Sequence, residues 1–158
     1  MWVGFSACGY RFAGSGSLPA GIKTISIPIF ENRTAETGLE NIVTNDLIYE
    51  VTRSRGVALV RKDKAEANLS GVIVSTQTGS ISRSSVDIST ERRVTLTLNL
   101  KLANTSGIII WSAQGVAESE AYVVEDDKQG TEQNRQDALS RASKRLAENI
   151  YNRLTEDF

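Results

Sequence analysis

The sequence predicts an α+β fold, in which two helices pack on one face of a mostly antiparallel sheet of four or slightly more strands to form a two-layer sandwich. Three observations lead to this prediction. A strictly alternating strand lies at residues 94–102, one amphipathic helix lies in each half of the chain, and the elements follow the order β, α, β, β, β, β, α. With 158 residues, the chain is long enough for one domain with one core.

The first expected strand is the isoleucine-rich segment at residues 21–32, GIKTISIPIFEN. Pro28 lies inside this segment, and a proline cannot donate a backbone hydrogen bond to a neighbouring strand. We therefore expect this strand to lie near an edge of the sheet.

A helix is expected next. Thr37 and Glu40 have the spacing of a capping box, in which a threonine side chain caps the helix start and a glutamate three residues later reaches back. Apolar residues then recur on one helical face: Leu39, Ile42, Val43, Leu47 and Val51. We expect this face to lie on the sheet and the helix to end near Gly56.

Two strands are expected after this helix, separated by a charged turn at residues 61–66. The first is short, at residues 57–60. The second runs through four apolar residues and continues into Ser and Thr; these residues are Leu69, Val72, Ile73 and Val74.

The segment VTLTLNLKL at residues 94–102 alternates without a break. Its apolar residues share one face: Val94, Leu96, Leu98, Leu100 and Leu102. Its polar residues share the other: Thr95, Thr97, Asn99 and Lys101. A period of two predicts one buried face and one polar face. A turn at residues 104–107 and an apolar segment after it predict a hairpin partner strand.

The last expected element is a long amphipathic helix at residues 131–155. Its expected inward residues are Leu139, Ala142, Leu146, Ile150 and Leu154. Its expected outward residues are Arg135, Arg141, Lys144 and Glu148.

Composition excludes several classes of function. The 18 basic and 19 acidic residues are interspersed and give a formal net charge of −1, so no long-range field favours nucleic acid. The chain has no histidine, no phosphate-binding glycine loop and no G-x-S-x-G elbow, so we expect no enzyme and no cofactor. The acidic triplet at residues 125–127 is interpreted as a solvated turn rather than a calcium site.

The single cysteine, Cys8, has three interpretations: a buried thiol, a reactive or metal-binding thiol, or an acylated anchor. With no second cysteine and no histidine, a disulfide within the chain and a thiolate or imidazole metal site are disfavoured. The stretch Phe5-Ser6-Ala7-Cys8 resembles a bacterial lipobox. We therefore interpret residues 1–7 as the remnant of a lipoprotein signal peptide, residues 8–20 as anchor and tether, and residues 21–158 as a single α+β domain.

Several quoted segments together resemble the lipopolysaccharide-assembly lipoproteins of the LptE family. They are Cys8-Gly9-Tyr10, LPAGIKTISIPIFENRT at residues 18–34, STERRVTLTLNLKL at residues 89–102, and AENIYNRL at residues 147–154. The resemblance covers almost the whole chain. It implies two helices on one side of a four-stranded sheet, which agrees with the order of elements above.

The resemblance also implies a function without catalysis. Members of this family are anchored in the periplasmic leaflet of the outer membrane, plug the LptD β-barrel, help it to assemble, and assist lipopolysaccharide transport to the cell surface. On this basis Cys8 is the expected lipid anchor, and the polar face of Thr95, Thr97, Asn99 and Lys101 is expected to face the barrel. A loop at residues 80–89 is expected to enter the barrel.

The expected lipopolysaccharide-binding residues are Arg83, Arg93 and Lys128, chosen because they lie at or near the ends of strands and helices. Ordinary surface charge is the other interpretation of these residues and of Arg92. The alternative function is an envelope scaffold or interaction module, such as the amino-terminal domain of TolB or a CsgG-like domain, that handles no lipid.

Overall fold

The computed structural model describes residues 17–81 and 90–156 of the chain. Its elements, in chain order, are η1 (Pro19–Gly21), β1 (Thr24–Ser26), β2 (Glu31–Asn32), α1 (Leu39–Arg53), β3 (Ala58–Leu59), η2 (Lys62–Lys64), β4 (Ala67–Ser80), β5 (Glu91–Asn104), β6 (Ile109–Val123) and α2 (Lys128–Glu156). Within the two described ranges, no helix has both the length and the apolar composition needed to cross a membrane.

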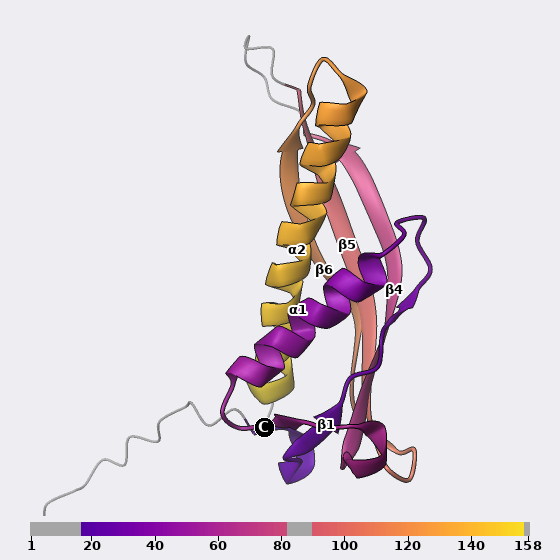
Figure 1. The fold of residues 1–158 in the computed structure, drawn as a ribbon, viewed down its shortest axis with the longest axis vertical. Helices are drawn as coiled ribbons and strands as arrows, with labels where there is room; N and C mark the ends of the chain where they lie inside the picture. The colour runs from indigo at the N-terminus through magenta and orange to yellow at the C-terminus, as the bar shows by residue number, and fades with distance from the viewer. Residues whose placement is uncertain (1–16, 82–89, 157–158) are drawn as a thin grey trace, which may run out of the picture.

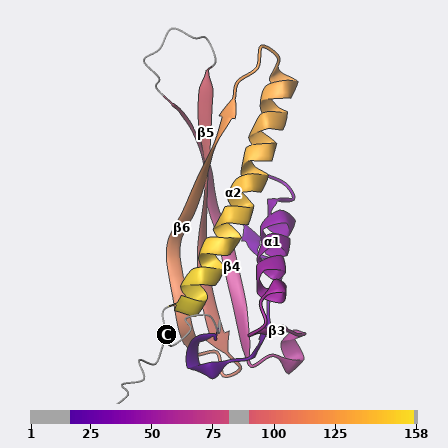
Figure 2. The same cartoon turned by 90° about the vertical axis from the view of Figure 1, so that its left-hand side faces the viewer.

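The strands form one mixed sheet, and both helices pack on the same face of it (Figure 1 and Figure 2). The long strands β4, β5 and β6 are antiparallel neighbours. On the other side of β4, the short strands β1 and β2 pair with it in parallel, and β3 pairs with β1. The predicted fold class, two helices on one face of a mostly antiparallel sheet, is confirmed.

The first predicted strand is divided in two. β1 and β2 flank Pro28, and they pair with separate parts of β4, at Ala67–Asn68 and at Val72–Ile73. The missing N–H of Pro28 accounts for the break between them. The predicted edge position is correct for β2, whereas β1 lies between β3 and β4.

The capping box predicted for α1 is wrong. The N-cap residue is Gly38, with a left-handed φ of 87°, and no side chain caps the helix. Thr37 therefore lies one residue too early to act as the cap. The start of α1 is instead joined to β2 by Asn32. Its side-chain amide donates to the Glu36 carbonyl oxygen at 2.8 Å and to Glu40 Oε2 at 2.8 Å.

The apolar face of α1 is largely as predicted. Leu39, Val43, Leu47 and Val51 are buried. Ile42 is the exception, with 40% of its surface exposed, because it lies at the margin of this helical stripe. The hydroxyl of Thr44 is buried as well and accepts a hydrogen bond from the Phe30 backbone N–H at 3.0 Å.

The alternation predicted for β5 is confirmed. All five apolar residues on its helix-facing side are buried: Val94, Leu96, Leu98, Leu100 and Leu102. The hairpin turn after β5 is also confirmed, since Gly107 adopts a left-handed φ of 81° and its N–H donates to the Asn104 carbonyl oxygen at 3.0 Å. The sheet therefore presents one apolar face to the helices.

The core side of α2 is as predicted, with Leu139, Ala142, Leu146, Ile150 and Leu154 all buried. The outward position predicted for Arg135 is wrong. Only 17% of its side chain is exposed, and its guanidinium lies within 2.6 Å of Glu36 and 2.7 Å of Glu132. Arg135 thereby joins α2 to the segment that precedes α1.

Candidate functional site

The sheet face opposite the helices is not covered by any described element, and it is polar (Figure 2). On β5 it carries Thr95, Thr97 and Asn99, which are partly buried, and Lys101, which is exposed. Across the strand register, Gln77 of β4 and Ser119 of β6 lie on either side of Thr95. Along β5 the face thus carries hydroxyl, amide and amine groups, while Val72 and Ala117 lie across the register beside Asn99 and Thr97.

Two of these polar side chains have partners within the sheet. The Thr95 and Ser119 hydroxyl oxygens lie 2.8 Å apart. Asn99 Oδ1 accepts a hydrogen bond at 2.8 Å from the N–H of Gly115, where β6 adopts a left-handed φ of 63°. This contact satisfies a donor that the local break in the ladder would otherwise leave unpaired. Asn99 therefore stabilises β6 whatever else it binds.

The carboxylates of β6 lie toward the helices. Glu118 and Glu120 pair across the sheet with Leu96 and Val94, whose side chains are buried under the helices. Both glutamates form ion pairs with Arg145 of α2, at 3.9 Å and 2.7 Å. On the uncovered side, the stretch of β5 from Arg93 to Lys101 carries cations and no carboxylate.

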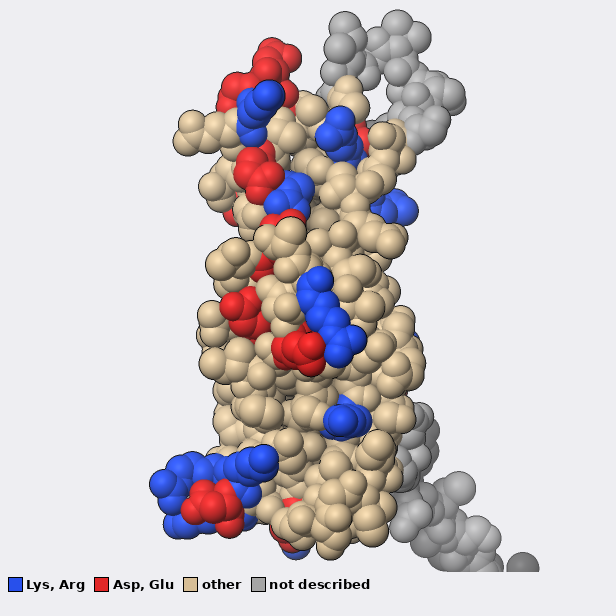
Figure 3. Space-filling view, turned by 90° about the vertical axis from the view of Figure 1, so that its right-hand side faces the viewer, with Lys and Arg blue, Asp and Glu red and all other residues tan. Residues whose placement is uncertain are grey.

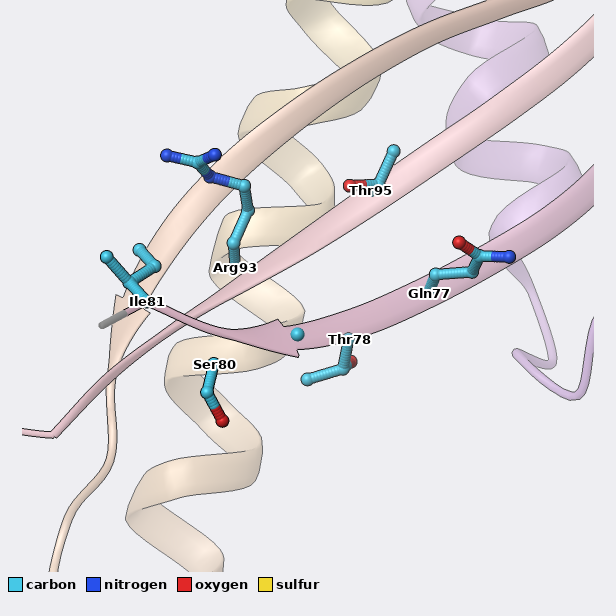
Figure 4. Close-up of a pocket in the computed structure, with 7 residues that line it drawn as sticks. Gln77, Thr78, Ser80, Ile81, Arg93 and Thr95 are labelled. Carbon is cyan, nitrogen blue, oxygen red and sulfur yellow. The ribbon is translucent and has the colours of Figure 1, made fainter.

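A shallow open groove crosses the end of this face, where β4 ends and β5 begins (Figure 4). Its volume is about 490 Å³. It is lined by Gln77, Thr78, Gly79, Ser80, Ile81, Arg93 and Thr95. Arg93 and Thr95 project from one face of the sheet, whereas Thr78 and Ser80 project from the other (Figure 4).

Arg93 is the charged group of this groove. Its side chain is exposed, and it forms no hydrogen bond or ion pair with any residue in the described ranges. Its five N–H donors are therefore available in the geometry that binds a phosphate or carboxylate through two parallel bonds. With the hydroxyl and amide groups beside it, the groove can bind an anionic, polar ligand.

The other predicted lipopolysaccharide-binding residues lie in different places. Lys128 is the first residue of α2, at the same end of the molecule but in the helix layer (Figure 1). Arg83 and most of the predicted barrel-entering loop lie outside the described residues, as does Cys8. The convergence of Arg83, Arg93 and Lys128 on one ligand stays a prediction.

The groove includes residues that the sequence did not single out. Gln77 and Gly79 of β4 pair across the sheet with Thr95 and Arg93. The Ser/Thr-rich end of β4 indicated a polar surface here. It did not indicate the pairing, because the register shifts between Ile73 and Ser75 and reverses the alternation of β4 from that point.

In the described part of the chain, no group of three or more His, Cys, Asp or Glu side chains could hold a metal ion. Residues 22–154 match the family model described as LptE, lipopolysaccharide-assembly.

The chain belongs to the LptE family.

The LptE family consists of assembly lipoproteins without catalytic activity. Solved structures similar to this chain include a minor lipoprotein from Acinetobacter baumannii, with a TM-score of 0.57, 17% identity, and coverage of 86% of this chain and 92% of that one. Another is lipoprotein B from Nitrosomonas europaea, with a TM-score of 0.56, 16% identity, and coverage of 98% and 92%. These likenesses show the fold. No curated protein matches the sequence.

Proposed function

We propose that this LptE-family chain is an outer-membrane lipoprotein, anchored through an acylated Cys8, that plugs an LptD-type β-barrel and assists lipopolysaccharide transport. The observation that carries the proposal is the polar sheet face with Arg93 at its end, whose side chain has no partner among residues 17–81 and 90–156. An enzyme is not part of the proposal, and neither is a cofactor.

The uncovered face suits the inside of a barrel. The lumen of a large outer-membrane barrel is polar, so a plug needs hydroxyl, amide and charged groups on its exterior rather than an apolar patch. Thr95, Thr97, Asn99 and Lys101 provide such a surface along one strand. A partner confined to membrane lipid would instead favour apolar side chains on this face.

The groove around Arg93 suits the phosphates of lipid A. Because the whole chain carries a formal net charge of only −1, attraction to a polyanionic lipid must come from a few local cations. The Arg93 guanidinium, which no described residue contacts through a hydrogen bond or ion pair, has the geometry for a bidentate contact with phosphate. We propose that Lys128 and Arg83 add charge at the same end of the sheet.

A lipopolysaccharide-binding assay tests this part of the proposal. Replacing Arg83, Arg93 and Lys128 with Ser is expected to weaken binding several-fold at low salt while leaving thermal stability nearly unchanged, since exposed charges contribute little to folding. A control with Arg55, Lys144 and Arg153 replaced by Ser changes the net charge equally at exposed residues that do not line the groove. If the first variant binds lipopolysaccharide as well as this control does, the site assignment is wrong.

The anchor is tested at the mature amino terminus. With a complete signal restored upstream, mass spectrometry is expected to find the mature chain beginning at an acylated Cys8. Gly9, rather than an aspartate, follows the cysteine and motivates the outer-membrane destination. An unmodified Cys8 behind a retained Met1 would rule out the anchor.

The barrel partner is tested by purification of the tagged chain from native membranes. An LptD-type barrel is expected to co-purify. Recovery of partners confined to the periplasm would support the scaffold function instead.

A further inference from the structure

The end of the molecule opposite the groove carries exposed apolar side chains on one short segment and basic side chains on another. We call it the hairpin end, and it consists of η1, η2 and the β5–β6 turn with the first residue of β6, residues 104–109. The register places these segments together, because Ala67 at the start of β4 pairs with Asn104 at the end of β5, and Ile25 of β1 also pairs with Ala67. Figure 1 shows the three segments at the same end.

Two adjacent isoleucines are held out at the tip of this hairpin. Ile108 is 62% exposed and Ile109 is 56% exposed. Asn104 fixes the turn before them, because its Oδ1 accepts hydrogen bonds at 3.0 Å from the N–H groups of both Ser106 and Ile108. The turn held by these hydrogen bonds thus presents both isoleucines to solvent.

Cations lie on a second segment at the same end of the molecule (Figure 1). η2 and the residue before it contribute Arg61, Lys62 and Lys64, which are exposed, and one carboxylate, Asp63, which pairs with Arg61 at 3.1 Å. Lys62 and Lys64 form no ion pair in the described part of the chain. Figure 3 shows Lys and Arg atoms gathered around a carboxylate at this end.

The described chain also begins here. Leu18 is buried, and η1, which follows it, contacts β6. Nine residues lie between Cys8 and Leu18, and the ten residue-to-residue steps between them span at most about 35 Å. An acyl anchor at Cys8 would therefore keep the hairpin end close to the membrane surface, and this step rests on the proposed function.

We propose that the hairpin end is a membrane-docking surface for anionic phospholipid. Ile108 and Ile109 enter the interfacial layer of the bilayer, and Lys62 and Lys64 contact the phosphate groups beside it. Apolar side chains flanked by cations are the combination that binds an anionic lipid surface. Docking would fix the orientation of the domain, which a tether alone leaves free.

Flotation of the full chain with lipid vesicles tests this proposal. The protein carries Cys8→Ser, so that neither an acyl chain nor an intermolecular disulfide contributes. Vesicles of phosphatidylethanolamine and phosphatidylglycerol are compared with vesicles of phosphatidylcholine. We expect binding to the anionic vesicles that weakens with salt, and little binding to the zwitterionic ones.

Two double variants identify the surface. Ile108→Asn with Ile109→Asn is expected to lower the binding constant at least ten-fold, and its matched control is Val123→Asn, 40% exposed at the other end of β6. Lys62→Ser with Lys64→Ser is expected to lower binding roughly five-fold per charge. Its control, Arg92→Ser with Lys144→Ser, changes the net charge equally elsewhere. Thermal unfolding confirms that each variant is folded.

The proposal is overturned if the parent does not bind anionic vesicles, or if the hairpin-end variants bind as their controls do. Because the vesicles contain neither lipopolysaccharide nor a barrel, such a failure would leave the proposed function standing. Conversely, loss of the barrel or lipopolysaccharide interaction in its own assay would not change the vesicle result.

Discussion

Gly71 leaves room for an aromatic ring in the core. A Cβ atom at this position would lie 2.7–2.9 Å from ring atoms of Phe30, which is closer than side chains pack. Phe30 is 3% exposed and belongs to the main core, so its ring has little space to move. The glycine is thus required by packing, in a strand position that otherwise favours a branched residue.

Gly71→Ala is therefore expected to lower the free energy of unfolding by about 1–3 kcal/mol, through overpacking against Phe30. Gly79→Ala is the matched control in the same strand, because a Cβ atom there meets nothing within 4 Å. We expect the control to change stability by less than about 0.5 kcal/mol. Urea unfolding of both variants measures the difference, and equal losses would contradict the packing argument.

Leu98 and Thr97 test the two faces of β5 one residue apart. Leu98 is fully buried under the helices, whereas Thr97 lies on the uncovered face. Leu98→Ala is expected to cost about 2–5 kcal/mol. Thr97→Ala is expected to cost less than about 1 kcal/mol in the isolated chain. Similar losses in denaturant titration would show that the polar face is as tightly packed as the apolar one.

At the scale of elements, Arg135 joins α2 to the segment before α1. Hydrogen bonds from Arg135 hold the pKa of the Glu36 carboxyl below its usual range, although burial opposes this shift. Hydrogen bonds from Arg135, and then from Gln136, lower the pKa of Glu132 to about 2. The pKa of Arg135 is raised by the same bonds to Glu132 and Glu36.

The sign of the pH dependence follows from these carboxyls. Because their pKa values are lower in the folded protein, their ion pairs stabilise it above the ordinary carboxyl pKa near 4.5, and this contribution is lost as the pH falls toward 2. Arg135→Met is thus expected to cost about 2–3 kcal/mol at about pH 7, with a difference from the parent that shrinks below about pH 4.5.

Arg141→Met is the control for this prediction. Arg141 is also on α2, but its side chain is 52% exposed and its distance to Glu120 is 3.6 Å. We expect it to cost less than about 1 kcal/mol. Urea unfolding across the acid range compares the two variants. A cost of Arg135→Met that stays constant down to about pH 2 would show that the ion pairs are not its origin.

The elements also show which features could be predicted from the sequence. The periodic patterns of β5 and α2 were sufficient to predict which face of each element is buried, because that face follows directly from the pattern. The partner of Arg135 could not be predicted, because Glu36 lies 99 residues away and meets it only through the packing of α1 on α2. The register shift in β4 between Ile73 and Ser75 could not be predicted for a similar reason, because it depends on the pairing of β4 with β5.

The candidate site was only partly predictable. Alternation placed Thr95, Thr97, Asn99 and Lys101 on the polar face, and the structure bears that out. Alternation did not reveal that Asn99 accepts a hydrogen bond from Gly115 of β6 or that Gln77 lies beside Thr95. Both features depend on cross-strand pairing. Choosing basic residues near the ends of elements correctly gave Arg93 as a surface residue. It could not show that Lys128 belongs to the helix layer rather than to the sheet.

At the scale of the whole molecule, the sheet has one face that the helices cover and one that no described element covers. The helices cover one face of the sheet through apolar contacts and ion pairs, so the side chains of that face have their partners within the domain. The other face is polar and uncovered, with the groove at one end and the hairpin end at the opposite one. The uncovered face is the surface that we propose for the barrel wall, and the hairpin end is the surface that we propose for phospholipid.

Photocrosslinking from Thr97 tests this central claim most directly. The chain carries a benzophenone amino acid in place of Thr97, at the middle of the uncovered face, and is irradiated in native outer membranes. We expect a covalent adduct with an LptD-type barrel. An adduct only with periplasmic proteins, or no adduct from a folded and membrane-anchored chain, would contradict it.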